Sequence, residues 1–191
     1  MTEKWLSIIG IGEDGLEGLS QAARTLVDTA EILVGGERHL AMVPEGTPDD
    51  TRTRKRWPSP FSALAEEIMQ GRGRKTCILA TGDPMCFGVG ATLRHSIPWD
   101  EATVIPASSA FALACARMGW AADEVEFVTL HGRPIELIGA VLRPDAKIIA
   151  LSHNAETVRS VADYLGARGY GDSEIIALCN MGGPNETRMS G

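Results

Sequence analysis

Residues 81–84, Thr-Gly-Asp-Pro, have the composition of a ligand-binding turn. They follow a short apolar run, Lys75–Ala80, that predicts a buried strand ending at this turn. In open α/β sheets, ligands gather beyond the carboxyl ends of the strands. A glycine there lets a ligand approach the backbone, and an acid accepts hydrogen bonds or favours a cation. Taken alone, the loop is explained equally well as an ordinary Asp-Pro turn.

A second glycine-rich loop, Gly10–Gly15, matches G-x-G-x-x-G directly after a predicted strand. It would suit an NAD(P)-dependent oxidoreductase, with Glu37 as the acid that binds the ribose. In that motif the helix begins inside the glycines so that its amides meet the pyrophosphate. Here residues 16–19 intervene before a helix capped by Ser20, and the loop carries acids where phosphates would lie. A flexible turn or a pocket wall therefore fits better.

The basic stretch Thr51–Trp57 stands out in an acidic chain. If it is extended, Arg52, Arg54 and Arg56 share one face and Lys55 lies on the other. Arginine binds carboxylates in a bidentate fashion, so the three could hold a polycarboxylate substrate. The alternative is a solvated edge strand whose charges prevent pairing with another chain.

Strand and helix patterns alternate along the whole chain, which indicates α/β layers with mainly parallel pairing. The pattern restarts near residues 119–124, so we expect an N-terminal α/β domain, 1–120, and a C-terminal α/β domain, 121–191. Apolar runs and helical periodicity place the elements as follows: strands at 5–9, 32–34, 75–80, 103–105, 126–130, 146–151 and, last, 175–179; helices at 20–30, 60–70, 108–118, 135–142 and 154–167.

Composition narrows the function classes. The chain has 191 residues, 44% of them hydrophobic, and a net charge of -7, which argues against a broad nucleic-acid-binding surface. Its four cysteines are widely spaced, so neither a disulfide framework nor a metal site is predicted. With no signal peptide and no membrane-length apolar run visible, we expect a cytoplasmic protein without membrane association.

Four motifs occur in order along the chain: "IGIGEDGLEGLSQAA", "ATGDPMCFGVGATL", "VIPASSAFALACARMGW" and "TLHGR". Together they resemble the tetrapyrrole methylases, the S-adenosylmethionine-dependent methyltransferases of cobalamin and siroheme biosynthesis. The serine pair in the third motif, "TLHGRP" and the closing "CNMGGPNETR" are most similar to the precorrin-6Y C5,15-methyltransferase branch, in the portion that acts at C5. The resemblance covers essentially the whole chain.

That resemblance implies two α/β domains, with S-adenosylmethionine (product S-adenosylhomocysteine) in the interdomain cleft, and a homodimer. Glu13 stands where many relatives have proline, which puts a direct contact from Glu13 in doubt. The family pattern, carried over position by position, implies these cofactor-binding residues: Thr81, Gly82, Asp83, Cys86, Ser108, Ser109, His131 and Gly182.

The implied reaction is C-methylation of a precorrin at C5, a displacement that needs neither a metal nor an enzyme nucleophile. No general base is identified: the resemblance places His131 beside the cofactor, and His39, His95 and His153 are interpreted as structural or surface residues. In some organisms a decarboxylating C15-methyltransferase domain follows, so we expect such a domain, fused or separate, as a partner. A non-catalytic module that binds a corrin intermediate is the remaining alternative.

Overall fold

The computed structural model describes residues 4–45 and 51–191, and the chain divides into two compact units between Ser109 and Ala110. The sequence placed this boundary near residues 119–124. Helix α5 (Ala110–Met118) contacts strand β7 (Lys147–Leu151) of the C-terminal unit, and the division therefore precedes this helix. Among the described residues, no helix has the length and apolar character needed to cross a membrane.

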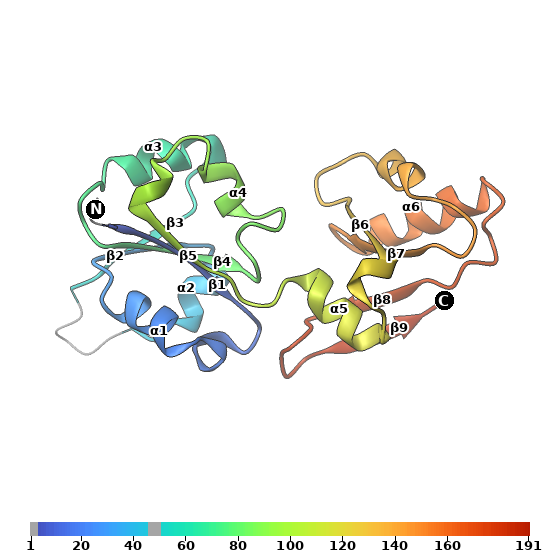
Figure 1. Ribbon diagram of the computed structural model, residues 1–191, viewed down its shortest axis with the longest axis horizontal. Helices are drawn as coiled ribbons and strands as arrows, with labels where there is room; N and C mark the ends of the chain where they lie inside the picture. The colour runs from blue at the N-terminus through green and yellow to red at the C-terminus, as the bar shows by residue number, and fades with distance from the viewer. Residues whose placement is uncertain (1–3, 46–50) are drawn as a thin grey trace. The chain divides into compact units, whose positions relative to one another are not determined.

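The N-terminal unit is built on a five-stranded parallel sheet with the strand order β3-β2-β4-β1-β5 (Figure 1). Because every pairing is parallel, the carboxyl ends of all five strands meet at one edge of the sheet. The strands are β1 (Leu6–Ile11), β2 (Ile32–Gly35), β3 (Thr53–Arg56), β4 (Thr76–Thr81) and β5 (Ala102–Ile105).

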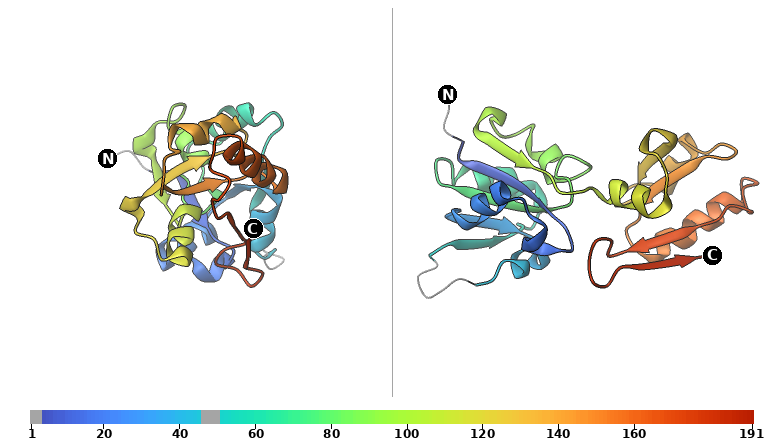
Figure 2. Two further views of the ribbon diagram at one scale, coloured as in Figure 1. Left: turned by 90° about the vertical axis from the view of Figure 1, so that its right-hand side faces the viewer. Right: turned by 60° about the horizontal axis from the view of Figure 1, so that its bottom comes forward.

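Helices cover both faces of this sheet, as Figures 1 and 2 show. Helices α1 and α2 pack on one face, and α3 and α4 pack on the other. Strand β1 is buried along its whole length, as expected for a parallel strand covered on both sides. The elements are α1 (Gln21–Asp28), α2 (Glu37–Met42), α3 (Leu64–Met69) and α4 (Val89–Leu93), with short 3-10 helices η1 (Gly15–Gly18), η2 (Phe61–Ala63) and η3 (Trp99–Glu101).

The period of two along each strand decides which residues face which helices. Leu6 and Ile8 pack toward α3 and α4, whereas Ile9 and Ile11 pack toward α1 and α2. The predicted strands of this unit are found, and Ser20 caps α1 by accepting a hydrogen bond from the Ala23 amide. The helix predicted over residues 60–70 begins instead as the 3-10 helix η2 and becomes α-helical only over α3.

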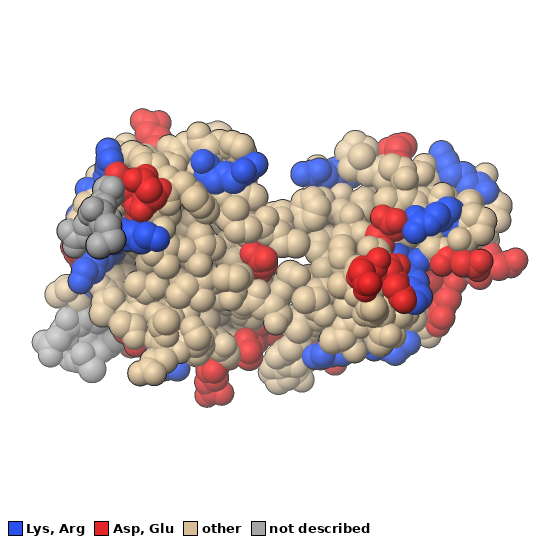
Figure 3. Space-filling model, viewed as in Figure 1, with Lys and Arg blue, Asp and Glu red and all other residues tan. Residues whose placement is uncertain are grey.

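The C-terminal unit pairs β6 (Val125–Thr129) with β7 in parallel and β8 (Ile176–Cys179) with β9 (Thr187–Ser190) antiparallel. Helices α5 and α6 (Ala155–Gly166) and the 3-10 helices η4 (Ala122–Glu124) and η5 (Ile135–Ala140) complete it. On the face of this unit seen in Figure 3, acidic and basic side chains are interspersed. Its ion pairs include Lys147–Glu124, at 2.6 Å.

Three predictions for the C-terminal unit were wrong in detail. The predicted helix 108–118 begins at Ala110, and the predicted helix 135–142 is the 3-10 helix η5. Residues 175–179 do not contain the last strand, because a turn closed by the Gly183 amide and the Asn180 carbonyl returns the chain as β9. All four residues of β9 are exposed, so the strand carries no apolar alternation that could reveal it.

Candidate functional site

A topological switch point lies at the carboxyl edge of the N-terminal sheet. Neighbouring strands β1 and β4 continue to helices on opposite faces, β1 to α1 and β4 to α4. In open α/β sheets, ligands bind in the crevice that such a divergence leaves beyond the strand ends. Thr81, the last residue of β4, and the loop that follows it lie at this position.

The loop after β4 crosses over the end of β1. The Gly82 amide donates to the Ile11 carbonyl (3.0 Å), and the Gly82 carbonyl accepts from the Ala107 amide (3.1 Å). A Cβ on Gly10 would lie 1.9 Å from the Gly82 oxygen, and Gly82 itself has φ +58°. Only glycine permits both the close approach at position 10 and the left-handed backbone at position 82 without strain.

Asp83 and Cys86 complete the loop. The Asp83 carboxylate accepts a hydrogen bond from the Met85 amide (2.8 Å), which is an Asx turn. Cys86 is hydrogen-bonded to Ser109, and partial burial, followed by the Asp83 carboxylate, raises the pKa of the Cys86 thiol. The structure therefore brings six of the eight predicted cofactor residues to one edge: Thr81, Gly82, Asp83, Cys86, Ser108 and Ser109.

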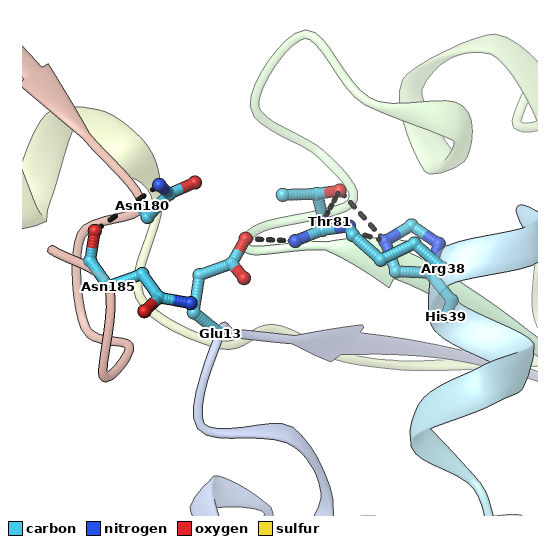
Figure 4. Close-up of polar contacts among 6 residues, drawn as sticks. All are labelled: Glu13, Arg38, His39, Thr81, Asn180 and Asn185. Atoms are coloured by element: carbon cyan, nitrogen blue, oxygen red, sulfur yellow. Dashed lines mark hydrogen bonds and ion pairs between the residues drawn. The ribbon is translucent and has the colours of Figure 1, made fainter.

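A polar network lies beside Thr81 (Figure 4). Arg38, from the start of α2, forms an ion pair with Glu13, in the loop after β1. Its other terminal nitrogen lies 3.1 Å from the Thr81 hydroxyl and 3.2 Å from His39 Nε2. His39 Nε2 is also 2.9 Å from the Thr81 hydroxyl. The network thus joins the ends of β1, β2 and β4.

The sequence indicated that His39 is either a structural or a surface residue, and the structure shows that it is buried. Burial, and after it the Arg38 guanidinium, lowers the pKa of His39 below its ordinary 6.5, against an opposing effect of Glu13. Its Nδ1 has no hydrogen-bond partner within the described part of the chain. Sequence reasoning missed Arg38 and His39 as site residues. The available signal was their position just after Gly35-Gly36, at the carboxyl end of a strand.

The Gly10–Gly15 loop does not have dinucleotide-binding geometry. Strand β1 continues to Ile11, the 3-10 helix η1 follows, and α1 begins only at Gln21. The Asp14 carboxylate lies within the loop, 2.5 Å from where a Cβ on Gly12 would be. The N-terminus of α1 lies beyond these glycines, and the acid Asp14 lies in the loop that a pyrophosphate would occupy.

Arg54 and Arg56 lie on the α1/α2 face of edge strand β3, because Arg54 pairs with Leu33 in the sheet register, and Arg52 precedes this strand. Arg54 donates to the carbonyls of Leu40 (3.2 Å), Val43 (2.8 Å) and Pro44 (2.6 Å), at the end of α2. It therefore caps that helix. Arg52 donates to the Val27 carbonyl (3.5 Å), and Arg56 pairs with Glu37 (3.0 Å).

The two remaining predicted cofactor residues, His131 and Gly182, belong to the C-terminal unit. The His131 ring packs edge-on against His153, with centroids 4.7 Å apart. The Gly182 amide donates to Glu186 (2.8 Å), which also pairs with Arg117. Arg117 first, and then this amide, lower the pKa of Glu186 to about 2. In residues 4–45 and 51–191, no group of three His, Cys, Asp or Glu side chains could hold a metal ion.

Two kinds of curated relatives match the chain. The precorrin-6Y C(5,15)-methyltransferase [decarboxylating] of Sinorhizobium sp is 37% identical over 95% of this chain and 43% of its own length. The protein of the same name from Mycobacterium tuberculosis is 36% identical over 96% and 45%. The cobalt-precorrin-7 C(5)-methyltransferase of Salmonella typhimurium is 28% identical over 95% and 87%. The chain thus spans less than half the length of the first two relatives.

Solved structures share the fold. The cobalamin biosynthesis precorrin-6Y methylase from Archaeoglobus fulgidus superposes with a TM-score of 0.70 at 25% identity, over 98% of this chain and 89% of its own. A uroporphyrin-III C-methyltransferase from Thermus thermophilus, complexed with S-adenyl homocysteine, superposes with a TM-score of 0.63 at 19% identity, over 97% and 82%. The family model of the Tetrapyrrole (Corrin/Porphyrin) Methylases matches residues 6–191, and the chain belongs to this family.

Proposed function

We propose that this chain is an S-adenosylmethionine-dependent C-methyltransferase that methylates a precorrin at C5 in cobalamin biosynthesis. The observation that carries the proposal is the switch-point edge of the N-terminal sheet, where six of the residues expected to bind the cofactor converge. Methyl transfer as the reaction type is supported by the family and by the relatives, which are all named as methyltransferases.

The lengths of the relatives support C5 as the position. Those named for both C5 and C15 methylation with decarboxylation are more than twice as long as the stretch that matches this chain. The Salmonella relative is named for C5 methylation alone, and the chain covers 87% of it. The segment common to both kinds corresponds to C5 methylation. The C15-methylating, decarboxylating activity, in a fused or separate domain, remains a prediction.

The carboxyl edge fits the cofactor chemically. When bound, S-adenosylmethionine supplies an electrophilic methyl group from its sulfonium. The chain contributes hydrogen-bond acceptors at Thr81 and Asp83, and glycine backbone at Gly82 that a ligand can approach closely. Its main contribution is to hold the reacting carbon in line with the methyl group, which is worth up to about 7–11 kcal/mol. Cofactor binding by His131 and Gly182, which belong to the C-terminal unit, stays a prediction.

For the carboxylate-rich substrate, Arg56 is the best of the three arginines. Its ion pair with Glu37 is largely exposed, so the guanidinium can exchange that partner for a substrate carboxylate. Arg54 is engaged by the carbonyls of α2. We assign Arg54 to stability and keep Arg52 and Arg56 as candidate substrate contacts. The homodimer stays a prediction that rests on the family resemblance, and the cytoplasmic location stays a prediction that rests on the sequence alone.

The test is methyl transfer. The purified chain, S-adenosylmethionine labelled in its methyl group and a C5-unmethylated precorrin, with and without cobalt, should give a tetrapyrrole that carries one label. Binding of S-adenosylmethionine without labelling of any supplied precorrin would support the non-catalytic module. Protection from heat by NADH or NADPH, but not by S-adenosylhomocysteine, would support the oxidoreductase. Either result would overturn the proposal.

A further inference from the structure

The contacts of the polar network at Thr81 favour one arrangement of its protons. Arginine has only donors, so the contact of 3.2 Å between Arg38 and His39 Nε2 requires a lone pair on Nε2. The neutral tautomer with its proton on Nδ1 makes this contact a hydrogen bond. In the opposite tautomer the Thr81 oxygen would accept from both His39 and Arg38, and the contact between Arg38 and His39 would bring two donors together. The first tautomer satisfies all three contacts and is therefore favoured.

This tautomer determines the direction of the Thr81 hydroxyl. Since Nε2 is an acceptor, the hydroxyl at 2.9 Å must donate its proton to His39. The same oxygen accepts from Arg38 at 3.1 Å. Thr81 then keeps one lone pair and has no proton left to offer. Because the residue is exposed at the strand end, that lone pair is what a ligand meets.

We propose that Arg38 and His39 are positioning residues that lock Thr81 as a hydrogen-bond acceptor, so that this edge selects a donor group of its ligand, such as a ribose hydroxyl or an amino group. The inference rests on the proposed function, which places S-adenosylmethionine at this edge. The inference adds Arg38 and His39 as the residues that decide whether Thr81 accepts or donates a hydrogen bond at the ligand. Arg38 and His39 need not touch the ligand themselves.

The surroundings of His39 are consistent with a neutral ring. The charged groups that act on it are Arg38, from its own helix α2, and Glu13, from the loop after β1, and these two are paired with each other. Thr81 from β4 and Trp57, which follows β3 and lies beside Gly36, are uncharged. Burial favours the neutral form, as the lowered pKa indicates.

The arrangement carries a cost that packing alone does not explain. The Nδ1 proton is buried without a hydrogen-bond partner among the described residues, which lowers the stability of the fold. An apolar side chain at position 39 would remove that donor. A histidine here is understandable if its Nε2 has a task, and the task that we infer from the contact of 2.9 Å is to accept the Thr81 proton.

The experiment measures S-adenosylhomocysteine affinity by calorimetry between pH 5.5 and 8. His39→Leu should weaken binding at pH 8 about five- to tenfold, the size of one lost hydrogen bond, without lowering Tm. Thr81→Val should weaken binding similarly, and Thr81→Ser should stay within about threefold of wild type. Wild-type affinity should fall as pH drops below 6.5 and His39 gains a proton, because Nε2 then becomes a donor.

His39→Gln offers an amide oxygen to Thr81 but does not titrate, so it should bind within about threefold of wild type and lose the His39 share of the pH dependence. His95→Gln is the matched control and should keep the wild-type pH profile, and His131→Gln is measured beside it because His131 is itself a predicted cofactor residue. Wild-type affinity in His39→Leu, or an unchanged pH profile in His39→Gln, would overturn the inference.

A ligand-free measurement separates this inference from the proposed function. Nitrogen-15 NMR of the His39 ring should show the proton on Nδ1 at pH 7. A proton on Nε2 overturns the inference whatever the affinity. If the Nδ1 tautomer is present and the wild type binds no S-adenosylhomocysteine, the proton arrangement stands, but the cofactor assignment and the selection of a donor group fail together.

Discussion

The two edges of the N-terminal sheet each carry an arginine–glutamate pair, and the pairs differ in what else they bind. At the amino edge, Glu101 pairs with Arg72 and accepts a hydrogen bond from the Trp5 indole (2.5 Å). At the carboxyl edge, Arg38 pairs with Glu13 and extends to Thr81 and His39. In the first pair the Glu101 carboxylate is buried, while the second pair reaches the exposed Thr81 hydroxyl.

Burial separates the two carboxylates but not the two arginines. The Glu101 side chain is 6% exposed and that of Glu13 is 29% exposed, whereas Arg72 (52%) and Arg38 (45%) are both about half exposed. A buried carboxylate with all its partners in place fastens the loops that enter β1, β4 and β5, and it offers nothing to a ligand. A half-exposed network that ends in a lone pair of the Thr81 hydroxyl can bind a ligand. We therefore assign the amino edge to stability and propose the carboxyl edge as the binding edge.

The largest effect on stability should come from the amino edge. Glu101→Gln weakens the hydrogen bonds that the buried Glu101 carboxylate accepts from the half-exposed Arg72 and from Trp5, so Tm should fall by about 5–10 °C. Arg72, and after it Trp5, lower the pKa of Glu101, so the carboxylate stabilises the fold above about pH 4.5 and loses that effect as pH falls through its folded pKa. The difference from wild type should therefore shrink in acid, as followed by circular dichroism.

Affinity for S-adenosylhomocysteine should not change in Glu101→Gln at a temperature where the variant is folded. Glu156→Gln is the control, because its pair with Arg159 is exposed and 3.7 Å long, and its Tm should stay at the wild-type value. Loss of affinity in the folded Glu101 variant would contradict the division between the two edges.

A smaller effect should come from Arg54, which caps α2, the helix that carries Arg38 and His39. Arg54→Ala removes charged hydrogen bonds to the last carbonyls of this helix and should lower the free energy of unfolding by about 1.5 kcal/mol, as measured by urea denaturation. It should also weaken S-adenosylhomocysteine binding slightly, because the helix places the network at the carboxyl edge.

Lys55→Ala, on the opposite face of β3, should change the unfolding free energy by less than about 0.5 kcal/mol. If Arg54→Ala left stability unchanged but impaired precorrin methylation, Arg54 would be a substrate contact and the capping role would be wrong.

Sequence reasoning located most of the carboxyl edge and little of the network beside it. The apolar run before Thr81 and the glycine and acid after it predicted a strand end with a special backbone, and Gly82 has that backbone. The α/β class followed from the alternation of apolar runs and was confirmed by the parallel sheet. Local pattern is enough for such features because they depend on neighbours in the chain.

Features that depend on distant partners were not predictable. Sequence reasoning assigned Arg38 no role and indicated a structural or surface residue at His39, and only the sheet order, which places β2 beside β4, brings them to Thr81. Arg54 on β3 was grouped with its neighbours by period, although its partners are carbonyls at the end of α2. Strand order and helix termini are settled by tertiary packing, on which one sequence carries no direct information.

The central claim is that the methyl donor binds at the carboxyl edge of the N-terminal sheet. Titration of the nitrogen-15-labelled protein with S-adenosylhomocysteine tests it directly, because amide shifts locate the ligand residue by residue. The account predicts the largest shifts at the amides of Gly82, Asp83, Ser108 and Ser109, with none at the amides of Trp5, Arg72 and Glu101. Saturable binding with the largest shifts at the amino edge, or with none at either edge, would contradict it.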